Sequence, residues 1–247
     1  MEKKSKLIKI IFSIIFAVLI LGTFAYMLFQ NLEQPRQSDF EKPYLTYGMI
    51  ILCFVLSLVF TRKSEKQIYI TLLLALNVAS MFFLLYSNLT EQNKLIGLAI
   101  YCGLEFVYVL YTVALHKSLG MKVVNISVRV ALCLLIYFVM PKYFTSHTFT
   151  TIEFMALMCL ANSLVTLLAM LFKIKTEWLT FLGFLLVFVA EVVTVLQNGG
   201  WSLLNVTNAN VLDIFNKYDI VFYAYFPGLL LVSLSSVWAK PLMRGDE

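Results

Sequence analysis

The sequence comprises 247 residues, of which 61% are hydrophobic and 13% are charged, and its mean hydropathy is +0.86. Soluble domains are about half apolar, so this composition excludes a soluble globular protein and indicates one embedded in a membrane. The formal net charge is +5; it follows from the placement of lysines and arginines around the predicted spans, and it indicates no nucleic-acid partner. Apolar segments run along the whole chain, so we expect a single integral membrane domain, residues 1–247.

Eight apolar segments are long enough to cross a bilayer as α-helices, which needs about 20 residues each. They are continuous, whereas the strands of a membrane barrel alternate in polarity, so we expect an all-α fold. The sequence predicts a polytopic transmembrane helical bundle of about eight spans. The spans lie at about residues 8–29, 44–61, 67–87, 95–115, 123–141, 149–172, 178–197 and 219–239.

The first span follows a basic segment that contains Lys3, Lys4, Lys6 and Lys9. A secretory signal has an apolar run of roughly 7–15 residues that ends at a small-residue cleavage site. Here the apolar run continues to about Phe29 without such a site. We therefore expect a first span that is retained, with a cytoplasmic anchor.

Lysines and arginines are distributed unequally between the two sides of the predicted spans. With the N-terminus placed inside, 14 of the 19 basic residues, Arg129 among them, fall in inner segments and the other five in outer segments. Cytoplasmic segments are enriched in Lys and Arg. The distribution favours an even number of spans with both termini in the cytoplasm, and the cell membrane is the expected location.

The most informative residues are polar ones at membrane depth, because each costs free energy unless it faces a partner or water. They are Asn77 in the third span, Glu105 in the fourth, Glu153 and Asn162 in the sixth, Glu191 in the seventh and Asp219 at the start of the eighth. Glu153 and Asp219 lie close to the outer interface, where contact with water is the simpler explanation. Asn77 and Asn162 fit a structural and a functional role equally well.

Helical spacing places several polar residues on common faces. In the fourth span Tyr101, Glu105, Tyr108 and Thr112 are three or four residues apart and form one polar stripe. The corresponding stripes in the seventh and eighth spans contain Glu191, Thr194 and Asn198, and Asp219 with Tyr223. We expect these stripes to converge on a wet cavity in the central to outer half of the bundle.

Two carboxyl groups on polar faces, those of Glu105 and Glu191, suit acid–base chemistry. Low-dielectric surroundings favour the protonated form of a glutamate, which can then donate a proton. The alternative is a structural one, in which a protonated Glu105 hydrogen-bonds to a neighbour such as Asn77 and joins helices.

Covalent and metal-dependent chemistry are not indicated by the sequence. His116 and His147 fall at opposite predicted membrane faces, so no Ser-His-Asp or Cys-His set is available. The cysteines lie inside predicted spans without metal-ligand spacing. They are Cys53, Cys102, Cys133 and Cys159. We expect no cofactor, metal or disulfide.

From Lys42 onward, a series of motifs resembles a known family. Lys42-Pro43 opens the second span, Asn77 lies in the middle of the third, and Gly97-Leu98-Ala99 leads to Glu105 and Tyr108 in the fourth. This order is similar to that of the lysoplasmalogenase (YhhN-like) family of eight-span membrane proteins. In that family an aspartate stands at the place of Asn77 and a histidine at the place of Glu105, while Tyr108 matches.

The later spans resemble the same family. Residues 188–191, Phe-Val-Ala-Glu, stand where the family has Ser-Asp, so Glu191 keeps a carboxylate there. Residues 222–233 resemble its tyrosine-rich last span, in which a polar residue of the family is replaced near Gly228.

The resemblance implies an activity. Family members hydrolyse the vinyl ether bond of lysoplasmalogens and release a fatty aldehyde and a glycerophospho head group. For this chain it implies Glu105 and Glu191 as acid and base, in either order, with Asn77 and Tyr108 orienting water or substrate. The partner is a membrane lipid or lysolipid. The candidate substrate-binding residues are Tyr101, Thr194 and Tyr223.

Two other functions stay open from the sequence. One is a non-catalytic membrane protein of the same fold that binds lipid or serves as a sensor or immunity partner. The other is a small transporter in which Glu105 couples transport to protons, although the chain lacks the inverted repeats and broken helices typical of that class.

Overall fold

The computed structural model describes scattered residues between 7 and 29 and the ranges 41–60, 65–86, 90–143, 151–195 and 220–238. Within these ranges the chain is helical except at short joints, and it contains no strand. The prediction of an all-α fold is therefore confirmed for the described residues. Nine of the 22 residues of the predicted first span lie outside them, as do His147, Asn198 and Asp219.

The helices correspond closely to the predicted spans from the second onward, with every bound within four residues of the prediction. They are α2 (Glu41–Phe60), α3 (Glu65–Met81) with a π-helical end η2 (Phe82–Tyr86), α4 (Glu91–Leu115), α5 (Leu119–Tyr143), α6 (Thr151–Leu171), α7 (Ile174–Val195) and α10 (Ile220–Trp238). The agreement follows from the length of the apolar runs, because a helix must satisfy its own backbone hydrogen bonds across the apolar region of a bilayer.

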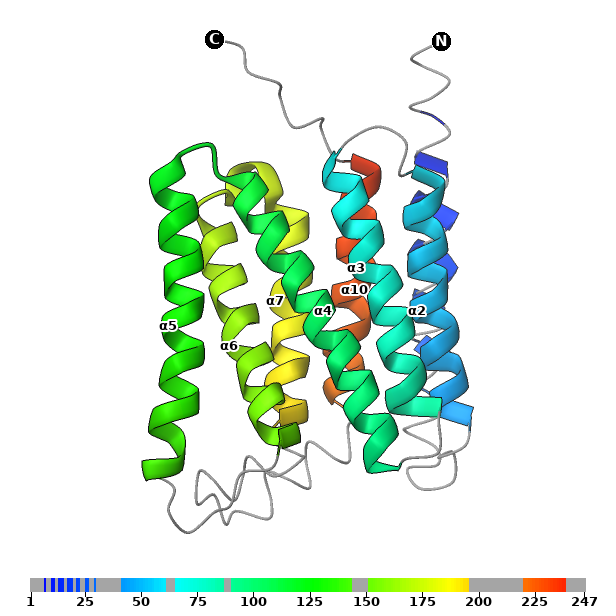
Figure 1. The fold of residues 1–247 in the computed structure, drawn as a ribbon. Helices are drawn as coiled ribbons and strands as arrows, with labels where there is room; N and C mark the ends of the chain where they lie inside the picture. The colour runs from blue at the N-terminus through cyan, green and yellow to red at the C-terminus, as the bar shows by residue number, and fades with distance from the viewer. Residues whose placement is uncertain are drawn as a thin grey trace.

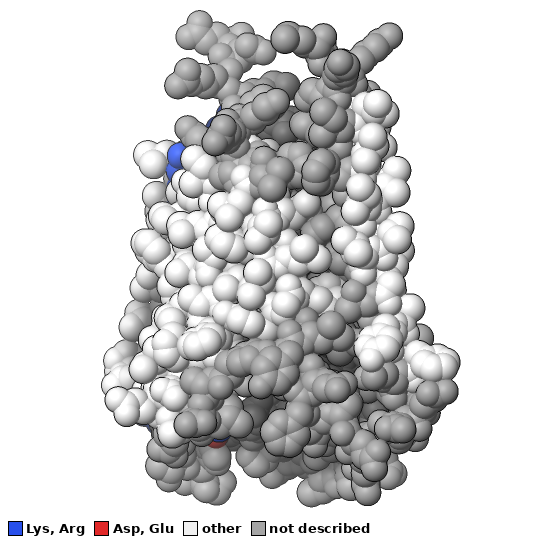
Figure 2. Space-filling view, turned by 90° about the vertical axis from the view of Figure 1, so that its right-hand side faces the viewer, with Lys and Arg blue, Asp and Glu red and all other residues white. Residues whose placement is uncertain are grey.

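Five of the described helices are long and apolar enough to cross a membrane. The segments are Gln67–Leu84, Gln92–Leu115, Leu119–Val139, Thr151–Leu171 and Glu177–Val195. Shorter apolar stretches lie within α2 and α10, at Tyr47–Leu58 and Tyr223–Ser236. Figure 2 shows one face of the molecule, on which charged atoms of described residues lie near the ends and the described side chains between them are uncharged. These are the properties of a membrane protein.

The helices lie side by side in a bundle (Figure 1). Helix α4 lies between α3 and α6, and α5 packs against α6 at one edge of the bundle. Helix α10 packs against both α7 and α2. Helices α3 and α10, which are far apart in the sequence, also contact each other. With α4 beside α3 and α7 beside α10, the polar side chains of these four helices meet in the interior of the bundle.

The polar stripe predicted for the fourth span faces the interior. Tyr101, Glu105, Tyr108 and Thr112 are all buried, whereas Phe106 on the opposite face is 61% exposed. A helix between two neighbours presents its apolar side to lipid and its polar side to partners, since lipid cannot hydrogen-bond. The structure therefore confirms the predicted face of this helix.

Helices α7 and α10 approach closely at two glycines, Gly183 and Gly228. A Cβ atom on Gly183 would lie 2.8 Å from the carbonyl oxygen of Gly228, and a Cβ on Gly228 would lie 2.8 Å from the carbonyl oxygen of Gly183. Small residues at a crossing let two membrane helices pack backbone against backbone. This contact sets the position of α7, which carries Glu191, relative to α10.

Cys102 on α4 and Cys159 on α6 face each other, with their Sγ atoms 3.6 Å apart. We predict that mild oxidation with copper phenanthroline joins this pair, because a movement of about 1.5 Å brings the sulfurs to the disulfide distance of about 2.05 Å. Peptide mass spectrometry would detect the linked peptides. Cys53 and Cys133 serve as internal controls and should keep their thiols; preferential oxidation of either one would contradict the α4–α6 packing.

Candidate functional site

A cluster of polar side chains lies in the interior of the bundle, at the level of the middle of α4. It is built by six helices, each of which contributes one to three residues. Its members are Asn77 from α3; Tyr101, Glu105 and Tyr108 from α4; Arg129 from α5; Asn162 and Ser163 from α6; Glu191 from α7; and Tyr225 from α10. The cluster brings together all four of the candidate catalytic residues predicted from the sequence.

Glu105 is buried, with 4% of its surface exposed, and helix α6 supplies its hydrogen-bond donors. Its Oε2 accepts from the Asn162 side-chain amide, and its Oε1 accepts from Ser163 Oγ at 2.9 Å. Asn162 Nδ2 also donates to the Glu105 carbonyl oxygen at 3.0 Å. Asn77, the partner suggested by the structural alternative, instead accepts from the Tyr225 hydroxyl at 2.5 Å. Glu105 therefore faces α6 rather than α3.

The prediction that Arg129 is one of the inner, membrane-flanking basic residues is wrong. The structure places it within α5, with 6% of its surface exposed. Arg129 therefore does not count among the 14 inner basic residues from which the orientation of the chain in the membrane was predicted. The spacing of Asn125 and Arg129, four residues apart inside an apolar helix, is the signal that could have revealed this polar face.

Every N–H group of the Arg129 guanidinium has an acceptor. Nε donates to Asn125 Oδ1 at 2.7 Å, and Nη2 donates to Thr112 Oγ1 and Thr166 Oγ1, each at 3.1 Å. Nη1 donates to the side-chain and backbone oxygens of Asn162. The geometry leaves no donor of this guanidinium free for a ligand.

The contacts of Arg129 determine how the Asn162 amide is oriented. Arginine only donates hydrogen bonds, so the oxygen of the Asn162 side chain must face Arg129 and its nitrogen must face away. That nitrogen donates to the Glu105 carboxyl. Asn162 therefore links the buried cation to the buried carboxyl group.

Glu191 on α7 lies on the other side of Ser163. Its Oε1 accepts a hydrogen bond from the Tyr101 hydroxyl, and its Oε2 is buried without a hydrogen-bond partner in the described part of the chain. The Ser163 hydroxyl, whose hydrogen bond goes to Glu105, lies close enough to interact with the Glu191 carboxyl as well. Ser163 is thus hydrogen-bonded to one of the two carboxyl groups and lies near the other.

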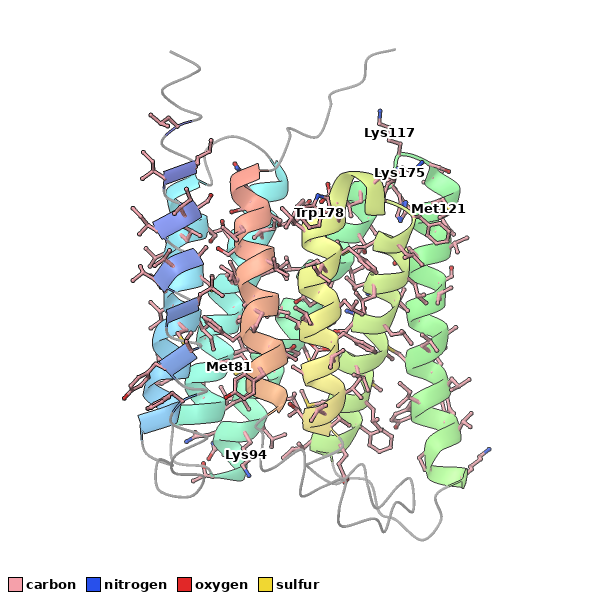
Figure 3. The ribbon with its side chains drawn as sticks, turned by 180° about the vertical axis from the view of Figure 1, so that it is seen from behind. Met81, Lys94, Lys117, Met121, Lys175 and Trp178 are labelled. Carbon is pink, nitrogen blue, oxygen red and sulfur yellow. The ribbon has the colours of Figure 1, made fainter. Side chains whose placement is uncertain are left out.

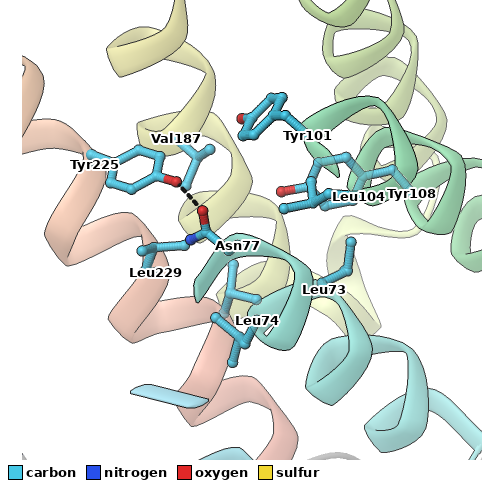
Figure 4. Close-up of a pocket in the computed structure, with 10 residues that line it drawn as sticks. Leu73, Leu74, Asn77, Tyr101, Leu104, Tyr108, Val187, Tyr225 and Leu229 are labelled. Carbon is cyan, nitrogen blue, oxygen red and sulfur yellow. Dashed lines mark hydrogen bonds between the residues drawn. The ribbon is translucent and has the colours of Figure 1, made fainter. Parts of the chain in front are cut away.

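A small pocket adjoins the cluster (Figure 4). Asn77, Tyr101, Tyr108 and Tyr225 supply its polar lining; the apolar lining is Leu73, Leu74, Leu104, Val187, Leu229 and Val232. The Nδ2 atom of Asn77, a residue only 1% exposed, has no partner among the residues that the structure describes. The space open to the centre of a water molecule is about 10 Å³, about enough for one water molecule.

Two predicted substrate-binding residues lie away from this pocket. Thr194 is exposed, and its hydroxyl donates to the Ala190 carbonyl oxygen of its own helix at 2.8 Å. Tyr223 packs against the core at the beginning of α10. Of the three candidates, Tyr101 lines the pocket. Glu153 lies in the first turn of α6.

A second polar group lies near the joints that follow α4 and α6. Glu177, at a kink in the first turn of α7, accepts from the Tyr111 hydroxyl at 3.2 Å and from Thr180 Oγ1 at 3.1 Å. His116 follows α4 directly, and burial together with the nearby Lys173 lowers its pKa. His116 therefore stays neutral over more of the physiological range, and it contributes no charge to this end of the bundle.

Among the described residues, no group of three or more His, Cys, Asp or Glu side chains is arranged to hold a metal ion. In comparisons with known proteins, no family model, no curated protein and no solved structure matches this chain. The chemistry of the cluster is therefore the basis on which a function is proposed.

Proposed function

We propose that this membrane protein is a divergent, lysoplasmalogenase-like hydrolase that cleaves the vinyl ether bond of a lysolipid by acid–base chemistry. The supporting observation is that Glu105 and Glu191, from two different helices, belong to one polar cluster, in which Tyr101, the hydrogen-bond donor to Glu191, and Tyr108 line a pocket of the size of a water molecule. An acid, a base and a site for water are the groups that this hydrolysis needs.

The reaction proceeds in three steps that balance in atoms and charge. The acid protonates the vinyl carbon farther from the ether oxygen, and positive charge develops on the carbon attached to that oxygen. The base removes a proton from water as the water oxygen adds to this carbon. The resulting hemiacetal collapses to a fatty aldehyde and the hydroxyl group of the glycerophospho product. Both carboxyls act within one cycle, and no redox partner is required.

The pocket accommodates the water, whereas the lipid must reach it from the membrane. Asn77 and Tyr108 line the pocket and are placed to orient water or the reacting bond. The lysolipid enters sideways from one leaflet, and its vinyl ether reaches the carboxyls when the helices that line the pocket separate. The hydrocarbon chain remains in contact with the apolar outer face of the bundle.

We predict that purified protein releases aldehyde from a lysoplasmalogen, and that Glu191→Gln and Glu105→Gln each lower kcat by roughly 100-fold or more, the usual contribution of an acid or base. Glu153→Gln is the matched control, because this carboxyl lies in the first turn of α6; its kcat should stay at the wild-type level. No aldehyde from the wild type above a detergent blank would exclude the hydrolase. Full activity in both glutamine variants would exclude these two residues as acid and base.

The fold comprises eight spans with both termini in the cytoplasm, and the protein resides in the cell membrane. Basic side chains support this orientation: Lys117 and Lys175 lie at one end of the bundle, close to the exposed Trp178, while Lys94 lies at the other (Figure 3). Lys122, in the first turn of α5, and Lys173, in the joint between α6 and α7, lie at the Lys117 end. Lysines gathered at one end are typical of a cytoplasmic membrane surface, and a tryptophan there is typical of either membrane interface.

Labelling of single cysteines tests this orientation in a cysteine-free background. An impermeant maleimide should label Lys94→Cys in intact cells, and it should label Lys117→Cys after lysis only. Each variant serves as the control for the other. The reverse pattern would place the N-terminal side outside the cell.

A second candidate function is supported by the hydrogen bonding of the cluster. Every N–H group of Arg129 and both oxygens of the Glu105 carboxyl have partners, which is what a network that only joins helices requires. A non-catalytic lipid-binding or sensor protein would use the same residues structurally. The aldehyde assay separates the two functions, since this candidate releases none.

A further inference from the structure

The polar cluster contains one permanent cation and two carboxyl groups. Arginine stays protonated in proteins, and an uncompensated charge at membrane depth is costly. The phenols of Tyr101, Tyr108 and Tyr225 are neutral in the physiological range. Cys102 and Cys159, which lie one helical turn before Glu105 and Asn162, are hydrogen-bonded to each other. The cluster is neutral when one of its two carboxyls is ionised and the other holds a proton.

The two carboxyl groups differ in how well their surroundings stabilise a negative charge. Both oxygens of Glu105 accept hydrogen bonds from α6, and one of these donors, Asn162, is itself polarised by Arg129. Glu191 receives one hydrogen bond, from Tyr101, and its Oε2 has no partner in the described ranges. Donors and a nearby cation stabilise a carboxylate, whereas a neutral oxygen that is buried unpaired costs less than a charged one.

We propose that Arg129, acting through Asn162, holds Glu105 as a carboxylate, so that Glu191 carries the single carboxyl proton of the site. The catalytic roles that follow rest on the proposed function: Glu191 is the acid and Glu105 is the base. Arg129 is a positioning residue, because every N–H group of its guanidinium donates to a protein acceptor. The charge assignment itself holds whether or not the protein is an enzyme.

Ser163 provides a route by which the proton returns from Glu105 to Glu191 after each turnover. After one turnover Glu191 has lost its proton to the substrate carbon and Glu105 has gained one from water. Glu105 then donates its proton to Ser163 Oγ, and the Ser163 hydroxyl, once it has turned from Glu105 toward Glu191, passes its own proton to the Glu191 carboxyl. One O–H bond forms and one breaks at the serine, and the resting state is restored without a proton from the aqueous phase.

Infrared spectroscopy of the purified protein in detergent near neutral pH tests the charge assignment. A protonated carboxyl has a C=O stretch separate from that of a carboxylate, and its frequency differs between Asp and Glu side chains. Glu191→Asp is expected to move the band of the buried acid, and Glu105→Asp is expected to leave it in place. Movement of the band in Glu105→Asp, or in neither variant, would overturn the proposal.

The role of Arg129 is tested by removing its charge. Arg129→Gln should raise the intensity of the buried acid band about two-fold, because both carboxyls are then protonated, and Arg129→Lys should restore the wild-type intensity. Lys142→Gln on the exposed last turn of α5 is the control and should leave the spectrum unchanged. An unchanged band in a folded Arg129→Gln protein would contradict the role of Arg129. The two aspartate variants decide the charge assignment even if the glutamine variant does not fold.

These readouts are independent of the aldehyde assay. A wild type that releases no aldehyde but shows the expected infrared shifts would exclude the proposed function and keep the charge assignment. A wild type that releases aldehyde but shows the band on Glu105 would exclude the charge assignment and keep the hydrolase.

Discussion

Gly228→Val is expected to lower the free energy of unfolding by about 3 kcal/mol or more, with loss of the α7–α10 contact. Even the first atom of a side chain at this position would lie 2.8 Å from the carbonyl oxygen of Gly183 and 2.9 Å from the backbone nitrogen of Val187. Backbone atoms in a helix cannot move aside singly, so the two helices must separate. Reversible unfolding in mixed detergent, followed by circular dichroism, would measure the loss.

The control for this substitution is Gly48→Val. Gly48 is an exposed glycine of α2 at which a Cβ atom would meet nothing within 4 Å. Its substitution should change the free energy of unfolding by no more than about 0.5 kcal/mol. Similar unfolding curves for the two variants would show that α7 and α10 do not cross at these glycines. Because α7 carries Glu191 and α10 carries Tyr225, Gly228→Val should also weaken the site.

Arg129→Leu is expected to cost about 3–5 kcal/mol, the usual effect of removing one partner from a buried ionic network. The substitution leaves the Asn125, Thr112 and Thr166 oxygens without the donor of Arg129 and leaves Glu105 without a compensating charge. The same unfolding measurement would detect this loss. Lys142→Leu, on the exposed end of the same helix, is the control and should change the free energy by about 0.5 kcal/mol or less.

The double variant Arg129→Leu/Glu105→Leu distinguishes a charge effect from simple loss of packing. Replacing both partners of a buried pair by apolar residues is often nearly neutral, so this variant should recover part of the stability lost in Arg129→Leu. The difference from additivity measures the coupling of the two groups. Strict additivity of the two single losses would contradict the linkage through Asn162.

Much of the fold could be predicted from the sequence because it depends on local properties. The length of each apolar run determines where a helix begins and ends in a membrane, and the bounds of α2 to α10 agree with those predicted. The inner face of α4 follows from spacing in the same way, since Tyr101, Glu105 and Tyr108 lie three or four residues apart. Both properties need no knowledge of the neighbouring helices.

The pairing of side chains across helices was decided by the tertiary structure. Glu105 is bonded to Asn162 and Ser163 rather than to Asn77, because α6 lies against the polar face of α4 at that depth. Arg129, grouped by sequence with the inner basic residues, belongs to this buried network. Spacing along one helix defines its faces, but the neighbour of each face depends on how the helices rotate and pack.

By itself, the sequence determined that this chain forms apolar helices with a polar stripe on α4 and two carboxyls at membrane depth. The tertiary structure alone decided that those carboxyls belong to one buried cluster, and that the side-chain amide of Asn162 links the buried Arg129 to Glu105. The physical reason is that a polar group in an apolar bundle is stabilised by whichever partner packing brings within about 3 Å, and that partner comes from a helix far away in the chain.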